Sequence, residues 1–206
     1  ARVLHERTEG LFSMVHLLPF FPYSSDDGFS VINYRQVNES LGGWEDITRF
    51  SKQYRLMGDL VMNHCSARSQ WFLQYAGNQP PGAGYFIEMD DTMDVSKVVR
   101  PRSSPLAKPV RTPAGEKFVW CTFSHDQVDL NYANPETLLE MVGIIAFYLD
   151  QGISIFRLDA VAYIWKVIGT SCVNLPETHE IIRLLRTLVA RRAPEAILIT
   201  ETNLPN

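Results

Sequence analysis

The chain lacks the features that mark several specialised classes of protein. Its 206 residues include three cysteines, an odd number without metal-ligand spacing, at positions Cys65, Cys121 and Cys172. A disulfide framework is therefore not expected, and we predict a reducing, cytoplasmic location. No run approaches about 18 uncharged apolar residues, so no membrane span is predicted. The first residues do not have the architecture of an export signal.

Positive charge is also scarce. Nineteen Lys and Arg residues against 23 Asp and Glu residues give a formal net charge of −4. A clustered basic face would be expected on a nucleic-acid-binding protein, so we predict no nucleic-acid partner. The sequence has no internal repeat and no low-complexity tract. Hydrophobic residues make up 46% of the chain, which is enough for a sizeable core. The length suits one large domain, or one domain with an inserted segment.

Apolar strands alternate with helices along most of the sequence. Helices are predicted at residues 44–54, 134–149 and 180–192, with Asn134 as an N-cap and Pro135 at the first helical position. Strands are predicted at residues 14–18, 56–62, 153–158 and 196–200. Because buried strands that alternate with helices form parallel sheets covered on both faces, the pattern predicts an α/β fold.

One long segment, residues 65–126, interrupts this alternation. It contains Pro80-Pro81-Gly82 and a stretch from Arg100 to Pro113 with four prolines, which exclude a helix or a central strand. An unstructured loop of this length is improbable in a compact domain, so we predict a small inserted subdomain.

Polar clusters follow three of the predicted strands, at Asn63-His64, Arg157–Asp159 and Glu201–Asn203. Side chains alternate along a strand, so Arg157 and Asp159 point the same way, and Glu201 ends the next strand. If these faces converge, an Arg, an Asp and a Glu meet where the strands end, the usual place for chemistry in such folds. The alternative is that each charge only marks the solvated end of a strand.

Several segments resemble signatures of a known family. Asp59–His64 (DLVMNH), Phe156–Ala160 (FRLDA) and Ile199–Asn203 (ITETN) are similar to three signature segments of the α-amylase family, glycoside hydrolase family 13. Gln127–Asn131 resembles a further short segment near the end of that family's domain B. His16–Phe29 (HLLPFFPYSSDDGF) is closer still to the branch that acts on sucrose, sucrose 6'-phosphate and glucosylglycerate. The resemblance covers nearly the whole chain.

The resemblance implies a partial TIM (β/α)8 barrel, strands two to five, with domain B inserted after strand three. Residues 1–64 would hold strands two and three, residues 65–126 domain B, and residues 127–206 strands four and five. The family's third catalytic carboxylate would lie beyond this sequence. We therefore expect the isolated chain to be inactive, and to need the missing strands or another chain for completion.

The resemblance also assigns the catalytic pair. Asp159 would be the nucleophile and Glu201 the general acid/base of a retaining glucosyl transfer, which needs two carboxyls roughly 5–5.5 Å apart. Arg157 would hold Asp159 ionised, because a nearby cation lowers the pKa of a carboxyl group. Asp59 and Asn63 are assigned structural roles.

Three further residues would bind the donor sugar. His64 would donate to a sugar hydroxyl, Asp26 would accept from hydroxyls at the closed end of the site, and Phe29 would form an apolar wall. Asp26 could instead be a turn residue of Asp26-Asp27-Gly28, and Phe29 could be simple packing.

No metal and no organic cofactor are predicted. Family members often bind calcium through the Asn of the first segment, an Asp near domain B and a later His. Here Asn63 and Asp129 remain without that His, which leaves too few oxygen ligands for calcium. The basic residues Arg100, Arg102, Lys108 and Arg111 could attract a phosphorylated acceptor, although a solvated loop is the favoured interpretation. Trp71, Trp120 and Trp165 could stack on sugars, but core positions are favoured.

The leading hypothesis is phosphorolysis of sucrose or a related α-glucoside, with a carbohydrate and inorganic phosphate as substrates and glucose 1-phosphate as product. The alternative within the family is a hydrolase or transglucosylase, since water or a sugar could replace phosphate. A catalytically inactive partner subunit is a third possibility, and the presence of Arg157, Asp159 and Glu201 argues against it.

Overall fold

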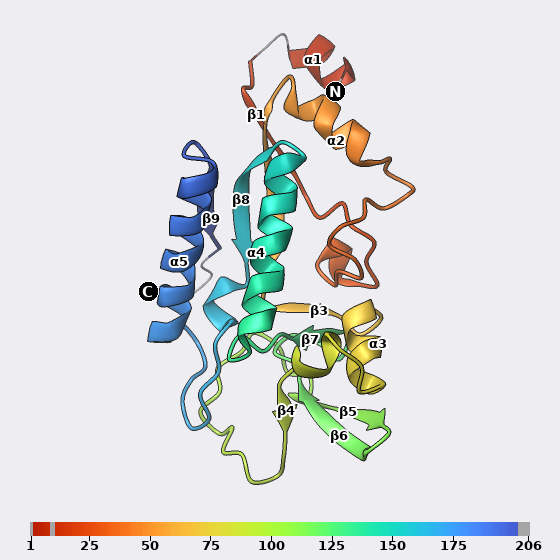
Figure 1. The fold of residues 1–206 in the computed structure, drawn as a ribbon, viewed down its shortest axis with the longest axis vertical. Helices are drawn as coiled ribbons and strands as arrows, with labels where there is room; N and C mark the ends of the chain where they lie inside the picture. Colours follow the sequence, from red (N-terminus) through yellow and green to blue (C-terminus); the bar gives the residue numbers. More distant parts are fainter. Residues whose placement is uncertain (1, 9–10, 202–206) are drawn as a thin grey trace.

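The computed structural model describes residues 2–8 and 11–201 of the chain. Its central feature is a parallel sheet of four strands in the order β1 (Met14–Leu17), β2 (Arg55–Val61), β8 (Ile153–Asp159) and β9 (Ile197–Thr200). All neighbouring pairs are parallel and follow the order of the sequence. The four predicted strands are therefore confirmed, and they form an arc of a (β/α) barrel (Figure 1).

Helices connect these strands and pack against the sheet. α2 (Trp44–Ser51) leads into β2, α4 (Pro135–Asp150) into β8, and α5 (Pro176–Arg192) into β9. The predicted N-cap is confirmed, because the Asn134 side chain accepts a hydrogen bond from the Glu136 backbone at 3.1 Å. α5 begins at Pro176 rather than at the predicted Glu180, since Pro is well suited to the first helical turn.

The segment between β2 and α4 forms a separate body at the opposite end of the molecule from α1 (Arg2–Thr8) (Figure 1). An antiparallel sheet has the order β4-β6-β5, and Pro109 lies on its edge strand, as the exclusion of a central strand requires. A two-stranded ribbon, β3 paired with β7, joins this body to the end of β2. The elements are β3 (His64–Ser66), α3 (Gln70–Ala76), η2 (Gly82–Gly84), β4 (Glu88–Met89), β5 (Ala107–Thr112), β6 (Gly115–Trp120) and β7 (Gln127–Asp129).

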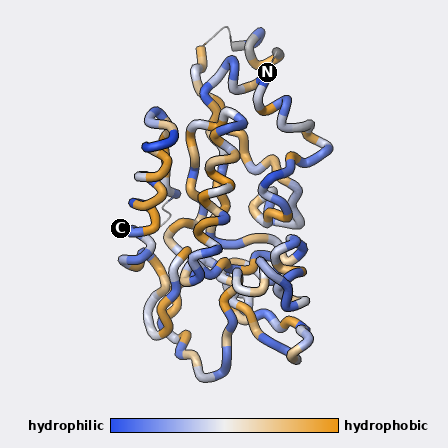
Figure 2. The backbone as a smooth tube through the Cα atoms, viewed as in Figure 1, coloured by the Kyte–Doolittle hydropathy of each residue, from blue (hydrophilic) through white to orange (hydrophobic). Residues whose placement is uncertain are grey.

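The core lies between the sheet and its helices. Figure 2 shows hydrophobic residues gathered along α4 and the strands behind it. Aromatic rings connect the loop after β1 to α4: Phe21 stacks on Tyr148 at 5.4 Å between centroids, and Trp44 meets Phe147 edge-on at 4.8 Å. These contacts fix the loop that carries Asp26 and Phe29 against the barrel helices.

The other face of the sheet would line the inside of a barrel. Register places Asp59 beside Arg157, and Arg157 beside Ile199, on this face. Apolar residues of this face on the two edge strands are exposed to solvent: Met14 is 47% exposed and Ile199 is 43% exposed. Within the described residues, no helix is both long enough and apolar enough to cross a membrane. The division of the chain at residues 64/65 and 126/127 stays a prediction.

Candidate active site

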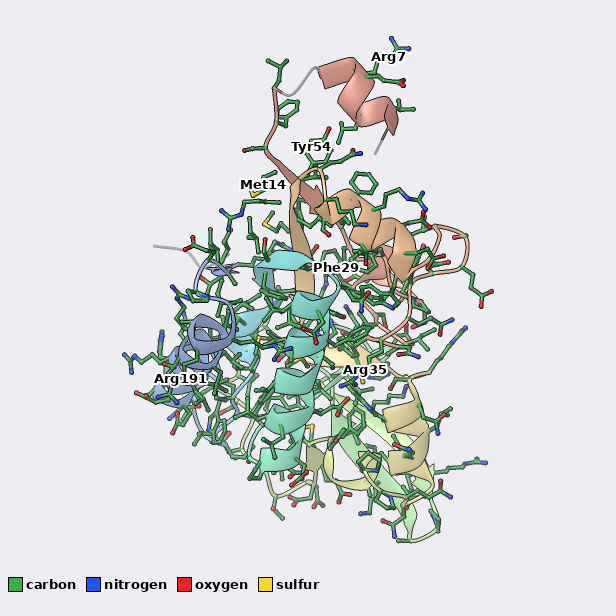
Figure 3. The ribbon with its side chains drawn as sticks, turned by 45° about the horizontal axis from the view of Figure 1, so that its top comes forward. Arg7, Met14, Phe29, Arg35, Tyr54 and Arg191 are labelled. Atoms are coloured by element: carbon green, nitrogen blue, oxygen red, sulfur yellow. The ribbon has the colours of Figure 1, made fainter. Side chains whose placement is uncertain are left out.

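A cavity of about 340 Å³ lies where β2, β8 and β9 end and domain B begins. All six side chains predicted for the site line it: Asp26, Phe29, His64, Arg157, Asp159 and Glu201. Pro101, Arg102, Phe123, Gln127, Ala160, Ala162 and Tyr163 complete the lining. Residues from four separate segments therefore converge on one space, although their individual roles remain predictions. Figure 3 marks Phe29 near the middle of the molecule.

Asp159 and Glu201 face each other across adjacent strand ends. Asp159 is the last residue of β8, and Glu201 follows β9 directly. The two carboxyls share a hydrogen bond, and the Ala160 backbone N–H donates to Glu201 Oε2 at 3.4 Å. Burial, then the hydrogen bond and the charge of Glu201, raise the pKa of Asp159 well above its usual range. The pair therefore favours a state in which one carboxyl is protonated and the other ionised.

Arg157 joins this pair to Asp59. Its guanidinium lies 2.5 Å from Asp59 Oδ1, 2.7 Å from Glu201 Oε1 and 3.6 Å from Asp159 Oδ1. The second oxygen of the fully buried Asp59 lies 2.9 Å from His16 Nε2 on β1. One cation thus holds three carboxylates from three strands, a geometry that suits the planar fork of Arg.

The sequence-based expectation for Arg157 needs a correction. Its positive charge does lower the pKa of Asp159, as expected. Burial and Glu201 outweigh that effect, so the net shift is upward rather than downward. The sequence could not show this, because it depends on how deeply Asp159 is buried and on which carboxyl it meets.

His64 also lines the cavity, at the start of β3, just after β2 ends. Its Nδ1 lies 3.2 Å from Asn63 Nδ2, and its Nε2 lies 3.0 Å from the Phe29 carbonyl oxygen. The tautomer with its proton on Nε2 donates to the Phe29 carbonyl and accepts from Asn63 at Nδ1, while Gln127 Nε2 lies 3.1 Å from His64 Nε2. Burial lowers the pKa of His64, so the neutral form is favoured. The Phe29 ring in turn lies 5.7 Å from the Arg157 guanidinium, the group that pairs with Asp159 and Glu201.

Among the further lining residues, sequence reasoning weighed a site role only for Arg102, and it assigned none to Gln127, Phe123 or Tyr163. Gln127 donates to Asp26 Oδ2 at 2.8 Å, and Arg102 lies 4.0 Å from Asp26 Oδ1. Phe123 packs edge-on against Tyr163 at 5.5 Å. Gln127 lies in a segment that resembles a family signature, which is a signal that could have been used. The Arg102 side chain is 55% exposed, which agrees with the solvated-loop interpretation, and it also lines the cavity.

A lysine lies between the two residues that could have bound calcium. Lys166 Nζ is 2.6 Å from Asp129 Oδ2 and 2.8 Å from Asn63 Oδ1. Asn63 Nδ2 also donates to Asp129, and the Thr122 hydroxyl donates to the same carboxylate at 2.6 Å. An ammonium group therefore lies beside the oxygens that calcium would need, and these residues do not fit the metal. Residues 2–8 and 11–201 contain no group of three or more His, Cys, Asp or Glu side chains that could hold a metal ion.

The remaining candidates are packing residues. Trp120 is fully buried, Trp71 and Trp165 pack against the core, and none of the three lines the cavity. Burial raises the pKa of Cys65 to about 12, so its thiol stays protonated and unreactive.

Comparison with known sequences identifies the family. The family described as "Alpha amylase, catalytic domain" matches residues 11–206. The chain belongs to the alpha-amylase family. The chain is 50% identical over 203 residues to a glucosylglycerate phosphorylase of Spirochaeta thermophila, covering 98% of the chain and 35% of that relative. It is 51% identical to the same kind of enzyme from Allomeiothermus silvanus, covering 98% of the chain and 37% of the relative.

More distant relatives extend the comparison. A sucrose phosphorylase of Bifidobacterium adolescentis is 30% identical, with 95% of the alpha-amylase chain and 41% of that relative covered. The crystal structure of sucrose 6F-phosphate phosphorylase from Thermoanaerobacter thermosaccharolyticum superposes with a TM-score of 0.88 and 28% identity, over 98% of this chain and 45% of that one. The expected partial TIM barrel is confirmed. The chain spans roughly a third of the length of its most similar relatives.

Proposed function

We propose that the protein carrying this chain is a retaining α-glucoside phosphorylase that uses glucosylglycerate as its donor. The opposed pair of Asp159 and Glu201 is the observation that carries this proposal, because a retaining transfer requires two facing carboxyls. The identity of about half with glucosylglycerate phosphorylases favours that donor over sucrose, whose phosphorylases are 29–30% identical.

The proposed reaction proceeds in two displacements. The donor carbon enters between the carboxyls and opens their hydrogen bond, and the proton that the pair shares passes to Glu201, which leaves Asp159 ionised. Glu201 then protonates the glycosidic oxygen while the Asp159 carboxylate attacks carbon 1, and glycerate leaves. In the second step Glu201 accepts a proton from phosphate as a phosphate oxygen attacks carbon 1, which releases glucose 1-phosphate and restores Asp159. Arg157 stays paired with Asp159 and Glu201 throughout, and its positive charge stabilises whichever of the two is ionised.

Arg102 supports an anionic acceptor. Arg102 lines the cavity from domain B, and among the described residues its one ion pair is the long contact with Asp26, at 4.0 Å. Arg157, by contrast, is occupied by three carboxylates. Glycerate and phosphate are both anions, so one guanidinium at the mouth of the cavity can serve the leaving group and the acceptor in turn.

Product analysis with and without inorganic phosphate tests the proposal. The full-length gene product should form glucose 1-phosphate from glucosylglycerate, and faster than from sucrose. Arg102→Ala should raise the KM for phosphate, whereas Arg111→Ala, an exposed arginine of the same subdomain that lies outside the cavity lining, should not. Release of glucose at an equal rate without phosphate would establish the alternative, a hydrolase.

A transglucosylase is the second candidate. Trehalose synthases are 33–34% identical to this chain, and the same carboxyl pair could pass glucose to a sugar hydroxyl. Formation of a new disaccharide in the absence of phosphate would favour it. A cytoplasmic location and inactivity of the isolated 206-residue chain remain predictions.

A further inference from the structure

Asp126, just outside the cavity lining, gathers a set of serine hydroxyls. Its Oδ2 accepts hydrogen bonds from Ser24 at 2.6 Å, Ser25 at 2.5 Å and Ser30 at 3.0 Å. Ser66 lies 2.5 Å from the Ser24 hydroxyl and extends the set. We call these five residues the Asp126 cluster. Burial alone would raise the pKa of Asp126, but the three serine hydrogen bonds outweigh it and lower that pKa, so the carboxylate is ionised.

The cluster holds a loop whose backbone is strained. Asp26 and Asp27 have φ values of 57° and 50°, in the left-handed region that residues with a side chain seldom adopt. Such conformations persist only when surrounding contacts hold them. Ser25 lies immediately before these two residues, and Ser30 follows the loop, so Asp126 bonds to both of its ends.

The same loop carries two groups of the predicted donor site. Asp26 Oδ2 accepts a hydrogen bond from Gln127 Nε2, and the Phe29 carbonyl oxygen lies 3.0 Å from His64 Nε2. Asp126 and Gln127 are consecutive residues at the predicted end of domain B, where the next barrel segment begins. Asp126 therefore fixes the two ends of the loop, and Gln127 fixes the Asp26 side chain. The position of Asp26 thus depends on how domain B packs against the loop.

We propose that Asp126 is a positioning residue for the glucosyl subsite, acting through the serines of the loop on Asp26. This inference rests on the proposed role of Asp26 in binding glucose, and it extends the site to residues that touch no substrate. The charge of Asp126 never enters the reaction. Its effect is to hold the acceptor groups for the sugar hydroxyls at a fixed distance from Asp159.

Binding and kinetics of the full-length gene product test this role. Asp126→Ala should raise the Kd of D-glucose, titrated into the Asp159→Asn background, and the KM of the glucosyl donor by at least about fivefold. The KM for phosphate should not change. Asp126→Asn should recover part of the loss, because its amide oxygen can still accept hydroxyl hydrogen bonds. Asp91→Ala, an exposed acid of the same subdomain, is the matched control and should behave as the parent.

A double-mutant cycle distinguishes positioning from general stability. If Asp126 acts through Asp26, then Asp126→Ala should cost little further glucose affinity once Asp26→Asn is present. Equal losses in both backgrounds, or equal increases in the KM values for donor and phosphate, would overturn the proposal. Should Asp126→Ala fail to fold, Ser25→Ala removes one of the three hydroxyls and should give a smaller loss of glucose affinity. An unchanged Kd for glucose in Ser25→Ala would overturn the proposal. The glucose titration does not depend on the acceptor, so it stays informative if phosphorolysis itself is not found.

Discussion

Replacement of Lys166 by Met should destabilise the protein strongly. The Lys166 side chain is 4% exposed and its partner Asp129 is 0% exposed, so the substitution leaves a buried carboxylate without its cation. Breaking a buried ion pair from one side costs about 3–5 kcal/mol. Asp129 keeps hydrogen bonds from Asn63 and Thr122, which favours the lower end of that range. A loss of about 3 kcal/mol corresponds to a more than hundredfold change in the unfolding equilibrium.

Denaturant unfolding followed by tryptophan fluorescence measures this loss. Trp120 is a local reporter, because its indole nitrogen donates to the Thr122 hydroxyl at 3.1 Å, next to Asp129. Lys97→Met, at an exposed lysine, is the matched control and should change stability by less than about 0.5 kcal/mol.

The double variant Lys166→Met with Asp129→Asn tests the cause. It removes the uncompensated charge, so it should be more stable than Lys166→Met alone. A cost below about 1 kcal/mol for Lys166→Met, or no recovery in the double variant, would refute the reasoning. Because Asn63 also contacts His64, Lys166→Met should weaken glucose binding as well. Neither calcium nor a chelator should alter the stability of the parent protein.

Three further predictions follow from the site and its loop. Glu201→Gln should lower kcat about 10²–10⁴-fold for a donor whose leaving group needs protonation, and much less for α-glucosyl fluoride; equal losses would contradict its role as the acid. Asp159→Asn should gain stability relative to the parent as pH rises from about 4 upward, because burial and Glu201 raise the pKa of Asp159 and the folded parent binds its proton more tightly than the unfolded chain. Melting temperatures at pH 5 and pH 8 give the comparison, and a constant difference would count against the raised pKa. Gly28→Ala should cost about 1–3 kcal/mol, since Gly28 has a φ of 109° and a Cβ would lie 2.8 Å from that of Pro19. Gly169→Ala, with a φ of 82° and open space around it, isolates the backbone strain and should cost less.

Much of the site was accessible from sequence because it follows from strand periodicity. Arg157 and Asp159 lie two residues apart on β8, and Glu201 ends the neighbouring strand, so a parallel sheet brings them to one edge. The contacts of Asp26 with Gln127 and of Ser24 with Asp126 join residues about a hundred positions apart. No local pattern encodes such pairs, because domain B must first fold back onto the loop after β1.

The sequence by itself determined the strand and helix order, the insertion, the family likeness and the candidate carboxyl pair, since each depends on local periodicity or on short segments. Tertiary structure alone decided the direction of the pKa shift at Asp159, the entry of Arg102 into the cavity and the position of Lys166 beside Asp129. These depend on burial and on distances between remote segments, which become fixed only when the chain packs.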